Sequence, residues 1–203
     1  MEALLEAGAR VTVCSADATP GLLARAETHE IIHHPRGYRP GDLHGAALVF
    51  AVTDDESLGA AVAAEAEREG AWVNVMDKLR YCNVVSPAVV HRGPVAVAVS
   101  TGGASPAIAK RVREEIERVI GPEYGVAATI LGEIRGLVMA REPDSGARAR
   151  LFAMLLDSGL LEALQARDET AVDTLLAELV GTDVSLSMLG LSPLLNDDGN
   201  PTP

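Results

Sequence analysis

The chain has 203 residues, of which 48% are hydrophobic, and this suits one medium-sized domain or two small ones with a real core. Aromatic residues make up only 3%, so that core must consist of aliphatic side chains. The formal net charge of −12 argues against a nucleic-acid-binding protein, because binding a phosphate backbone requires clustered Lys and Arg.

The N-terminus does not have the pattern of a signal peptide, since Glu2 and Glu6 lie where a basic segment and a long apolar run would stand. No apolar run reaches the roughly 18 to 20 residues that a membrane-spanning helix needs. We therefore expect a cytoplasmic protein without a membrane partner. Cys14 and Cys82 lack a CxxC spacing and are expected to be buried or half-buried thiols.

Helical and strand-like segments alternate in the first part of the chain. Helices are expected over residues 1–8, 20–27 and 56–70, and strands over residues 10–14, 30–33, 46–52 and 71–76. The strands are short and almost continuously apolar. This pattern predicts an α/β fold, with a Rossmann-like parallel sheet covered by helices on both faces. His33 and His34 are adjacent on one strand and face opposite ways, so no metal site is expected there.

The pattern changes after Asp77. Residues 84–91 and 94–100, separated by Arg92-Gly93, predict a β-hairpin, and a helix over 105–120 starts with Ser105 as its cap. Residues 124–180 are expected to be helical with a break at 142–146, and the polar end, 192–203, to fray. The expected parts are 1–83, a dinucleotide-binding domain; 84–122, a central segment; and 123–203, a helical domain.

Three segments carry polar residues that could form a site at the sheet edge. Ser15-Ala16-Asp17 follows a strand, where an acidic residue can bind the ribose of a dinucleotide; the alternative is that Asp17 caps the next helix. Thr53-Asp54-Asp55 ends another strand, and either caps a helix or lines the cofactor groove.

Asp77 and a glycine turn are the strongest candidates. Asp77 ends the strand 73–76 and is the expected general acid or base, although an isolated Asp at such a position more often only turns the chain. The turn comprises Thr101, Gly102, Gly103, Ala104 and Ser105. Its N–H groups at a helix start could bind a phosphate or a carboxylate, but Gly-Gly turns are also ordinary connectors. Lys110 on the following helix is a further candidate for binding an anion.

Several of these motifs occur in the order and spacing of a known family. They are residues 4–13, 49–55, 73–77, Cys82-Asn83, 86–88 and 100–106. Together they resemble precorrin-2 dehydrogenase, which occurs alone or as the N-terminal module of siroheme synthase. The resemblance covers most of residues 1–135 and continues more loosely over 151–180.

The resemblance implies NAD-dependent oxidation of precorrin-2 to sirohydrochlorin, on the way to siroheme or cobalamin. Some members also insert ferrous iron, so Fe²⁺ is an additional candidate substrate. It implies a homodimer joined through the central β and helical segment, and Asp77 as the acid or base. Ser15, Ala16, Asp17, Thr53, Asp54 and Asn74 would face NAD, and Thr101, Gly102, Gly103, Ser105 and Lys110 the tetrapyrrole. Lys78, Arg80 and Arg92 are further cations for its carboxylates.

The family opens with a strand and a glycine-rich loop that cradles the pyrophosphate, and this sequence contains no G-x-G-x-x-G. We expect that the natural start lies upstream of Met1, with a damaged cofactor site as the alternative, and that Met1–Pro203 alone binds NAD poorly. Two other functions stay open: a non-catalytic Rossmann-like ligand-binding module, which needs no glycine loop, and a metal chelatase without oxidase activity, which needs Asp77 but not NAD.

Overall fold

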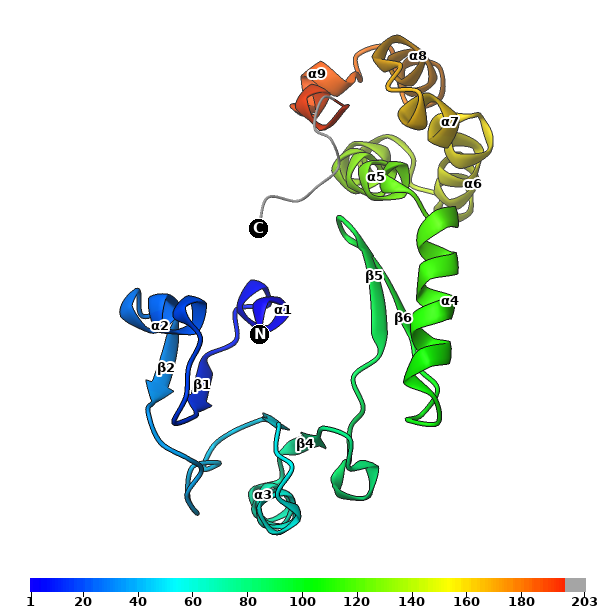
Figure 1. The fold of residues 1–203 in the computed structure, drawn as a ribbon. Coiled ribbons are helices and arrows are strands. Elements are labelled where there is room, and N and C mark those ends of the chain that lie inside the picture. Colours follow the sequence, from blue (N-terminus) through cyan, green and yellow to red (C-terminus); the bar gives the residue numbers. More distant parts are fainter. Residues whose placement is uncertain (196–203) are drawn as a thin grey trace. The chain divides into compact units, whose positions relative to one another are not determined.

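The computed structural model describes residues 1–195, and the chain forms two compact units, Met1–Val85 and Ser86–Pro203 (Figure 1). Each unit has its own hydrophobic core. Most of the segment that is predicted to fray, from residue 196 onward, lies outside the described residues. Ser192–Leu195, the start of that segment, form a short 3-10 helix, η2.

The first unit alternates helices and strands as its apolar pattern predicts. Its elements are α1 (Glu2–Glu6), β1 (Val11–Cys14), α2 (Pro20–Glu27), β2 (Ile31–His34), β3 (Leu48–Ala51), α3 (Glu56–Glu69), β4 (Trp72–Val75) and the 3-10 helix η1 (Leu79–Tyr81). The helix ends follow from local chemistry. Thr19 caps α2 by accepting from the amide of Leu22 at 3.3 Å, and α3 stops at Gly70, whose φ of +70° suits glycine.

Its strands form two parallel pairs, β1 with β2 and β3 with β4, and no ladder joins the pairs within residues 1–195. Val49, Val73 and Val75 point toward α3 and build the core with Val62 and Ala66. The other face of β3 and β4 is open.

The residues that make this open face are Leu48, Phe50 and Trp72, which are 40%, 48% and 59% exposed. The expectation of one sheet covered on both faces is therefore wrong for this pair of strands. An apolar run identifies a strand, but it carries no information about which strands become its neighbours.

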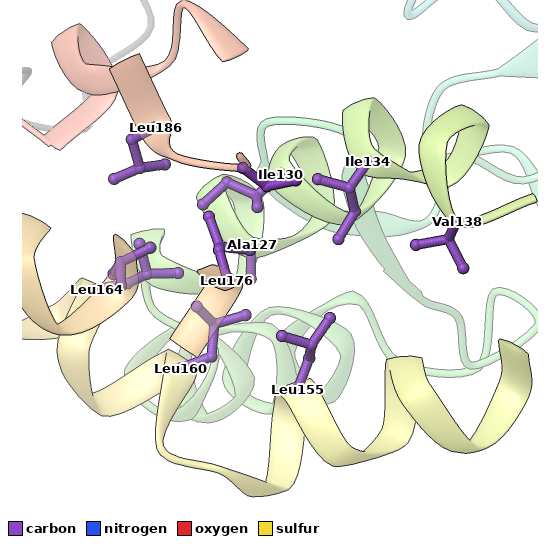
Figure 2. Packing of buried hydrophobic residues seen from close by; sticks show 11 residues of the cluster. Ala127, Ile130, Ile134, Val138, Leu155, Leu160, Leu164, Leu176 and Leu186 are labelled. Carbon is purple, nitrogen blue, oxygen red and sulfur yellow. The ribbon is translucent and has the colours of Figure 1, made fainter. Parts of the chain in front are cut away.

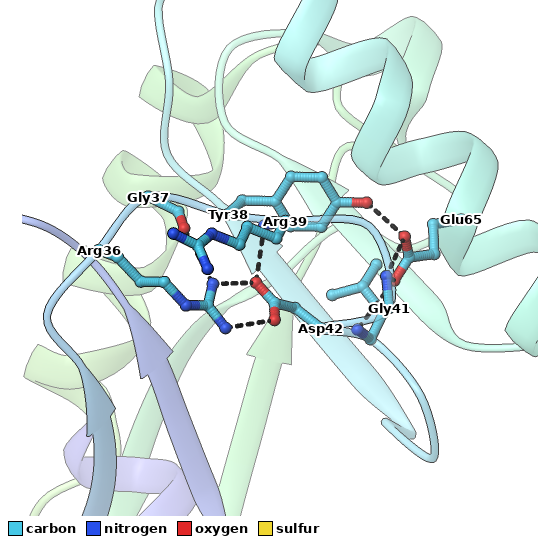
Figure 3. A network of polar contacts seen from close by, with 8 residues as sticks. Arg36, Gly37, Tyr38, Arg39, Gly41, Asp42 and Glu65 are labelled. Atoms are coloured by element: carbon cyan, nitrogen blue, oxygen red, sulfur yellow. Dashed lines mark hydrogen bonds and ion pairs between the residues drawn. The ribbon is translucent and has the colours of Figure 1, made fainter.

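The loop between β2 and β3 is held by two carboxylates (Figure 3). Glu65 of α3, only 4% exposed, accepts from the hydroxyl of Tyr38 at 2.5 Å and from the amides of Gly41 and Leu43 at 3.0 and 2.9 Å. Arg36 donates to both oxygens of Asp42 at 2.7 Å. The loop therefore has a fixed shape without strand pairing.

The second unit begins with an antiparallel hairpin and continues as helices. Its elements are β5 (Ala88–Arg92), β6 (Val95–Val99), α4 (Pro106–Val119), α5 (Pro122–Arg141), α6 (Ser145–Asp157), α7 (Leu160–Gln165), α8 (Glu169–Leu179) and α9 (Leu186–Leu189). The predicted hairpin is confirmed, but β5 starts later than predicted. The reason is that the amides of Asn83 and Val84 donate to the carbonyl of Val73, at 3.0 and 3.3 Å, so these residues run beside β4 instead.

The core of the second unit lies among α5 to α9 (Figure 2). Ile130 and Ile134 of α5 are fully buried, as are Leu155, Leu160 and Leu176 from α6, α7 and α8. The buried residues of this core are aliphatic, as the low aromatic content of the sequence predicts. Among residues 1–195, no helix combines the length and the apolar character needed to cross a membrane.

Candidate functional site

Ser15, Ala16 and Asp17 follow the carboxyl end of β1. The hydroxyl of Ser15 donates to the carbonyl of Asp17 at 2.5 Å, and a ring nitrogen of His33 lies 3.0 Å from the carbonyl oxygen of Ser15. Thr19, not Asp17, caps α2. The interpretation of Asp17 as a helix cap is therefore wrong, and its exposed carboxylate is available to accept hydrogen bonds from a ribose.

Thr53, Asp54 and Asp55 follow β3, and they have different structural roles. Asp55 is the cap of α3, since its carboxylate accepts from the amides of Ser57 and Leu58 at 2.8 and 3.3 Å. Hydrogen bonds from the Ser57 hydroxyl and these two amides lower the pKa of Asp55. Thr53 accepts from the amide of Asp55 at 3.1 Å, while Asp54 is exposed.

Asp77 lies beside this segment. Ala51 and Val75 are paired in register, so Thr53 and Asp77 each stand two residues beyond the same rung of the ladder. Asp77 is exposed and has a φ of +60°, a conformation that is uncommon outside glycine. The strand ends thus bring Thr53 and Asp77 to one edge, with the Asp77 carboxylate open to solvent.

Asn74 lies on β4, and its amide is already engaged by the protein. Its Nδ2 donates to the carbonyl of Val84 at 3.1 Å, which ties β4 to the segment that follows η1. The side-chain amide of Asn83 continues the same seam by donating to the carbonyl of Ala71 at 3.2 Å. The predicted role of Asn74 in facing a cofactor stays a prediction, but the structure adds a role in holding this strand.

Three of the four cations predicted to bind substrate carboxylates have partners that are distant in the sequence. Lys78 and Arg80 both approach Glu56 of α3. Arg92 donates to the carbonyls of Ile120 and Glu117, at 3.0 and 3.2 Å, and so caps the end of α4. No local pattern in the sequence predicts these contacts, because each partner is distant in the sequence.

Lys110 is the cation that the structure leaves most open. It lies on the first half of α4 with an exposed side chain, and its ammonium is 3.9 Å from Glu114 one turn later. Such an exposed pair is weak, so the ammonium can turn toward an anion at little energetic cost.

The glycine turn between β6 and α4 is closed by its own hydroxyls. Gly102 and Gly103 have φ values of +61° and +84°. The Thr101 hydroxyl accepts from the amide of Ser105 at 3.0 Å, and the Ser105 hydroxyl caps α4 by accepting from the amide of Ile108 at 3.3 Å. The amides of Gly102 and Ala104 also bond within the turn. Because the Thr101 hydroxyl itself donates to the carbonyl of Ser105 at 3.1 Å, an anion there would meet mainly the Ser105 hydroxyl and the start of α4.

The described residues hold no cluster of three or more His, Cys, Asp or Glu side chains arranged to bind a metal ion. Cys14 and Cys82 are free, half-buried thiols. Burial, followed by the nearby carboxylate of Asp42, raises the pKa of Cys14.

Three family models match the chain in order. They are described as putative NAD(P)-binding over residues 1–88, sirohaem biosynthesis protein central over 92–118, and sirohaem synthase dimerisation region over 123–180.

Curated relatives match across these regions. Siroheme synthase of Chromobacterium violaceum is 39% identical over 168 residues, which are 83% of this chain and 36% of that protein. Siroheme synthase 1 of Aeromonas salmonicida is 33% identical over 195 residues, 94% of this chain and 42% of that protein. The chain therefore spans somewhat more than a third of the length of these relatives.

A solved structure has the same fold. It is described as SirC, precorrin-2 dehydrogenase, and aligns with a TM-score of 0.68 and 20% identity, over 88% of this chain and 85% of that one. At this identity the match supports the α/β fold and the helical region, independently of any shared chemistry.

Proposed function

Because the chain belongs to the siroheme synthase family, in the part made of its NAD(P)-binding, central and dimerisation domains, we propose that it oxidises precorrin-2 to sirohydrochlorin with NAD. The observation that carries the proposal is the coincidence of these three ordered domains with an exposed carboxylate, Asp77, at the carboxyl end of β4. Ligands of α/β proteins bind at this edge of the sheet.

Asp77 is the proton acceptor of the proposed reaction. Dehydrogenation removes a hydride and a proton from neighbouring atoms of the substrate, and bound NAD⁺ supplies the hydride acceptor. The Asp77 carboxylate takes the proton and later releases it to water. Its exposed position gives the proton a path to solvent, and its place beyond the strand pair β3–β4 puts it at the edge where Thr53 also lies.

The residues after β1 and β3 fit the adenosine half of the cofactor. Asp17 carries an exposed carboxylate that is not used as a helix cap, which suits the two ribose hydroxyls. A carboxylate there disfavours a 2′-phosphate, so NAD is the expected cofactor rather than NADP. Ser15, Ala16, Thr53, Asp54 and Asn74 are the other proposed cofactor-facing residues.

The second unit is proposed to bind the tetrapyrrole and the second subunit. Precorrin-2 is a polycarboxylate, and the turn at Thr101, Gly102, Gly103 and Ser105 offers the Ser105 hydroxyl and a helix start, followed by the exposed ammonium of Lys110. The dimerisation-region match over 123–180 supports a homodimer. A cytoplasmic location belongs to the same proposal.

The test is an anaerobic incubation of the purified protein with precorrin-2, with and without NAD, followed by addition of Fe²⁺ or Co²⁺, with absorption spectra recorded throughout. NAD-dependent conversion supports the proposal. Metal insertion without NAD-dependent oxidation would instead identify a chelatase. No conversion under any condition, even by an N-terminally complete version of the protein, would identify a non-catalytic binding module.

Asp77→Asn separates the proposed proton transfer from folding. Asn tolerates a positive φ as Asp does, so the turn is expected to keep its shape. We expect the turnover rate to fall by roughly 100- to 10,000-fold, with an unchanged melting temperature. Asp157→Asn removes an exposed carboxylate at the end of α6 and serves as the control. Normal turnover by Asp77→Asn would reduce Asp77 to a turn residue.

A further inference from the structure

The conformation of Asp77 needs support from its surroundings. Asp77 is one of three non-glycine residues with positive φ among residues 1–195, the others being His29 and Arg167. A residue in this region costs of order 1 kcal/mol or more and persists only where neighbouring contacts impose it. The contacts around residues 75–82 therefore decide where the Asp77 carboxylate points.

The backbone closes the turn on one side. The amide of Lys78 donates to the carbonyl of Val75 at 3.1 Å, and the amide of Tyr81 donates to the carbonyl of Lys78 at 2.9 Å. The sulfur of Cys82 accepts from the amide of Val75 at 3.2 Å and lies 3.5 Å from the carbonyl of Lys78. These bonds tie the turn to the end of β4 but do not attach it to α3.

The attachment is made by Glu56, in the first turn of α3. Arg80 donates to its Oε1, and the Tyr81 hydroxyl donates to the same oxygen at 2.6 Å. The ammonium of Lys78 lies 3.8 Å from Oε2. Three side chains that follow Asp77 thus converge on one carboxylate, and hydrogen bonds from Tyr81 and Arg80 lower its pKa.

The ammonium of Lys78 is buried although it has no hydrogen-bond partner in the described residues. Its side chain is only 14% exposed, so Glu56 is the charge that offsets the cost of removing this cation from water. An exposed ion pair contributes little by itself, but a carboxylate shared by a buried ammonium, a guanidinium and a phenol constrains several side chains together.

Gly59 makes this approach sterically possible. It lies one turn after Glu56 and is buried, and a Cβ at this position would stand 3.3 Å from Val75 Cγ1, 3.5 Å from Lys78 Cδ and 3.6 Å from Tyr81 Cδ2. A Cβ there would crowd Val75 by a few tenths of an ångström and would touch the Lys78 and Tyr81 side chains, so glycine lets these side chains lie directly against α3. The close packing at Gly59 and the contacts to Glu56 are two independent observations that the turn is held against α3.

We propose that Glu56 is a positioning residue that anchors the 77–81 turn to α3 and so orients the Asp77 carboxylate. The inference rests on the proposed function, in which Asp77 accepts the proton. It also reassigns Lys78 and Arg80: both serve to hold the turn, and the carboxylates of the substrate are bound by other groups.

The first test compares Glu56→Gln with Glu67→Gln, which makes the same charge change at an exposed position of the same helix. A misplaced catalytic group slows the chemical step more than it weakens binding. We expect Glu56→Gln to lower kcat by roughly 10- to 100-fold, with the KM for precorrin-2 and NAD changed less than about twofold. Tyr81→Phe removes one of the contacts and should give a smaller loss of kcat. A kcat equal to that of Glu67→Gln would overturn the proposal.

The second test repeats Glu56→Gln in an Asp77→Asn background. If Glu56 acts through Asp77, the second substitution leaves the residual rate of Asp77→Asn unchanged, because the group that it orients is already gone. An equal fold loss in both backgrounds would overturn the positioning role while leaving the proposed function intact. Normal turnover by Asp77→Asn alone would instead overturn the function and, with it, this inference.

A structural measurement is independent of turnover. Amide hydrogen exchange in Glu56→Gln is expected to be faster at Lys78 and Tyr81, whose amides close the turn, and unchanged at Val62 in the middle of α3. Unaltered exchange at Lys78 and Tyr81 would show that the turn does not need Glu56, and would overturn the proposal.

Discussion

Glu65 shows how one buried carboxylate shapes the loop between β2 and β3. A hydrogen bond from Tyr38, with further bonds from the amides of Leu43 and Gly41, holds the pKa of Glu65 below its usual value near 4.5. A lowered pKa means that folding favours the ionised form, so the stabilisation is present above about pH 4.5 and is lost as the pH falls through the folded-state pKa.

Tyr38→Phe tests this linkage. Burial and the neighbouring carboxylate raise the pKa of Tyr38 to about 12, so its hydroxyl stays a donor at neutral pH. Removing it should lower the free energy of unfolding by about 1.5–3 kcal/mol at pH 7, the range for hydrogen bonds to charged groups. The difference in the free energy of unfolding between the variant and the wild type should become smaller below pH 4.5. Urea unfolding at both pH values measures it, and a pH-independent difference would contradict the argument.

The candidate site could be predicted in part at the scale of single residues. Asp77 and Thr53 were placed correctly at strand ends, because an apolar run followed by a polar residue marks the carboxyl end of a parallel strand. The partners of Lys78 and Arg80 could not be predicted. Glu56 stands 24 residues before Arg80, and only the packing of η1 on α3 brings the two together.

At the scale of elements, one glycine decides how closely α5 packs on the hairpin. A Cβ on Gly125 would stand 2.5 Å from the carbonyl oxygen of Arg92 and 2.7 Å from its carbonyl carbon, both of them backbone atoms that cannot turn aside. Gly132 and Gly136 on the same helix have nothing within 4 Å of such an atom. Substitution by alanine is therefore expected to have opposite effects at Gly125 and at the other two glycines.

Gly125→Ala should destabilise the second unit by about 1–3 kcal/mol, because α5 or the hairpin must shift to relieve the overlap. Gly132→Ala and Gly136→Ala should each stabilise it by up to about 1 kcal/mol through the better helix propensity of alanine. Thermal unfolding followed by circular dichroism gives the order of stabilities. A Gly125→Ala variant as stable as the other two would show that α5 and the hairpin can separate freely.

The predicted elements agree with the structure where local chemistry determines where a helix begins or ends. Thr19-Pro20 and Ser105-Pro106 start helices, and Gly70 ends one, as their capping chemistry requires. Strand pairing was less predictable. The first four residues expected for β5 include Val84, which instead lies along β4, because its hydrogen bond to Val73 outweighs β propensity there.

At the scale of the whole molecule, the chain has two cores of different construction. The first is built between α3 and the strands β3 and β4, and the second among the helices α5 to α9. A core substitution should therefore act first on its own unit. The chain also offers a selective probe, because Trp72, its one tryptophan, lies on β4, while most of its helical residues belong to the second unit.

Ile134→Ala tests both this division and the proposed homodimer. Ile134 is fully buried in the second core, and its truncation should cost about 2–5 kcal/mol. The urea midpoint measured by circular dichroism at 222 nm should fall, while the midpoint of Trp72 fluorescence moves little. Val75→Ala, in the first core, should give the opposite pattern.

If the second unit dimerises, its midpoint should also rise with protein concentration, since only the folded state binds a second copy. The Trp72 transition should not depend on concentration in this way. A concentration-independent transition at 222 nm, together with a monomeric mass from light scattering over the same range, would contradict the homodimer.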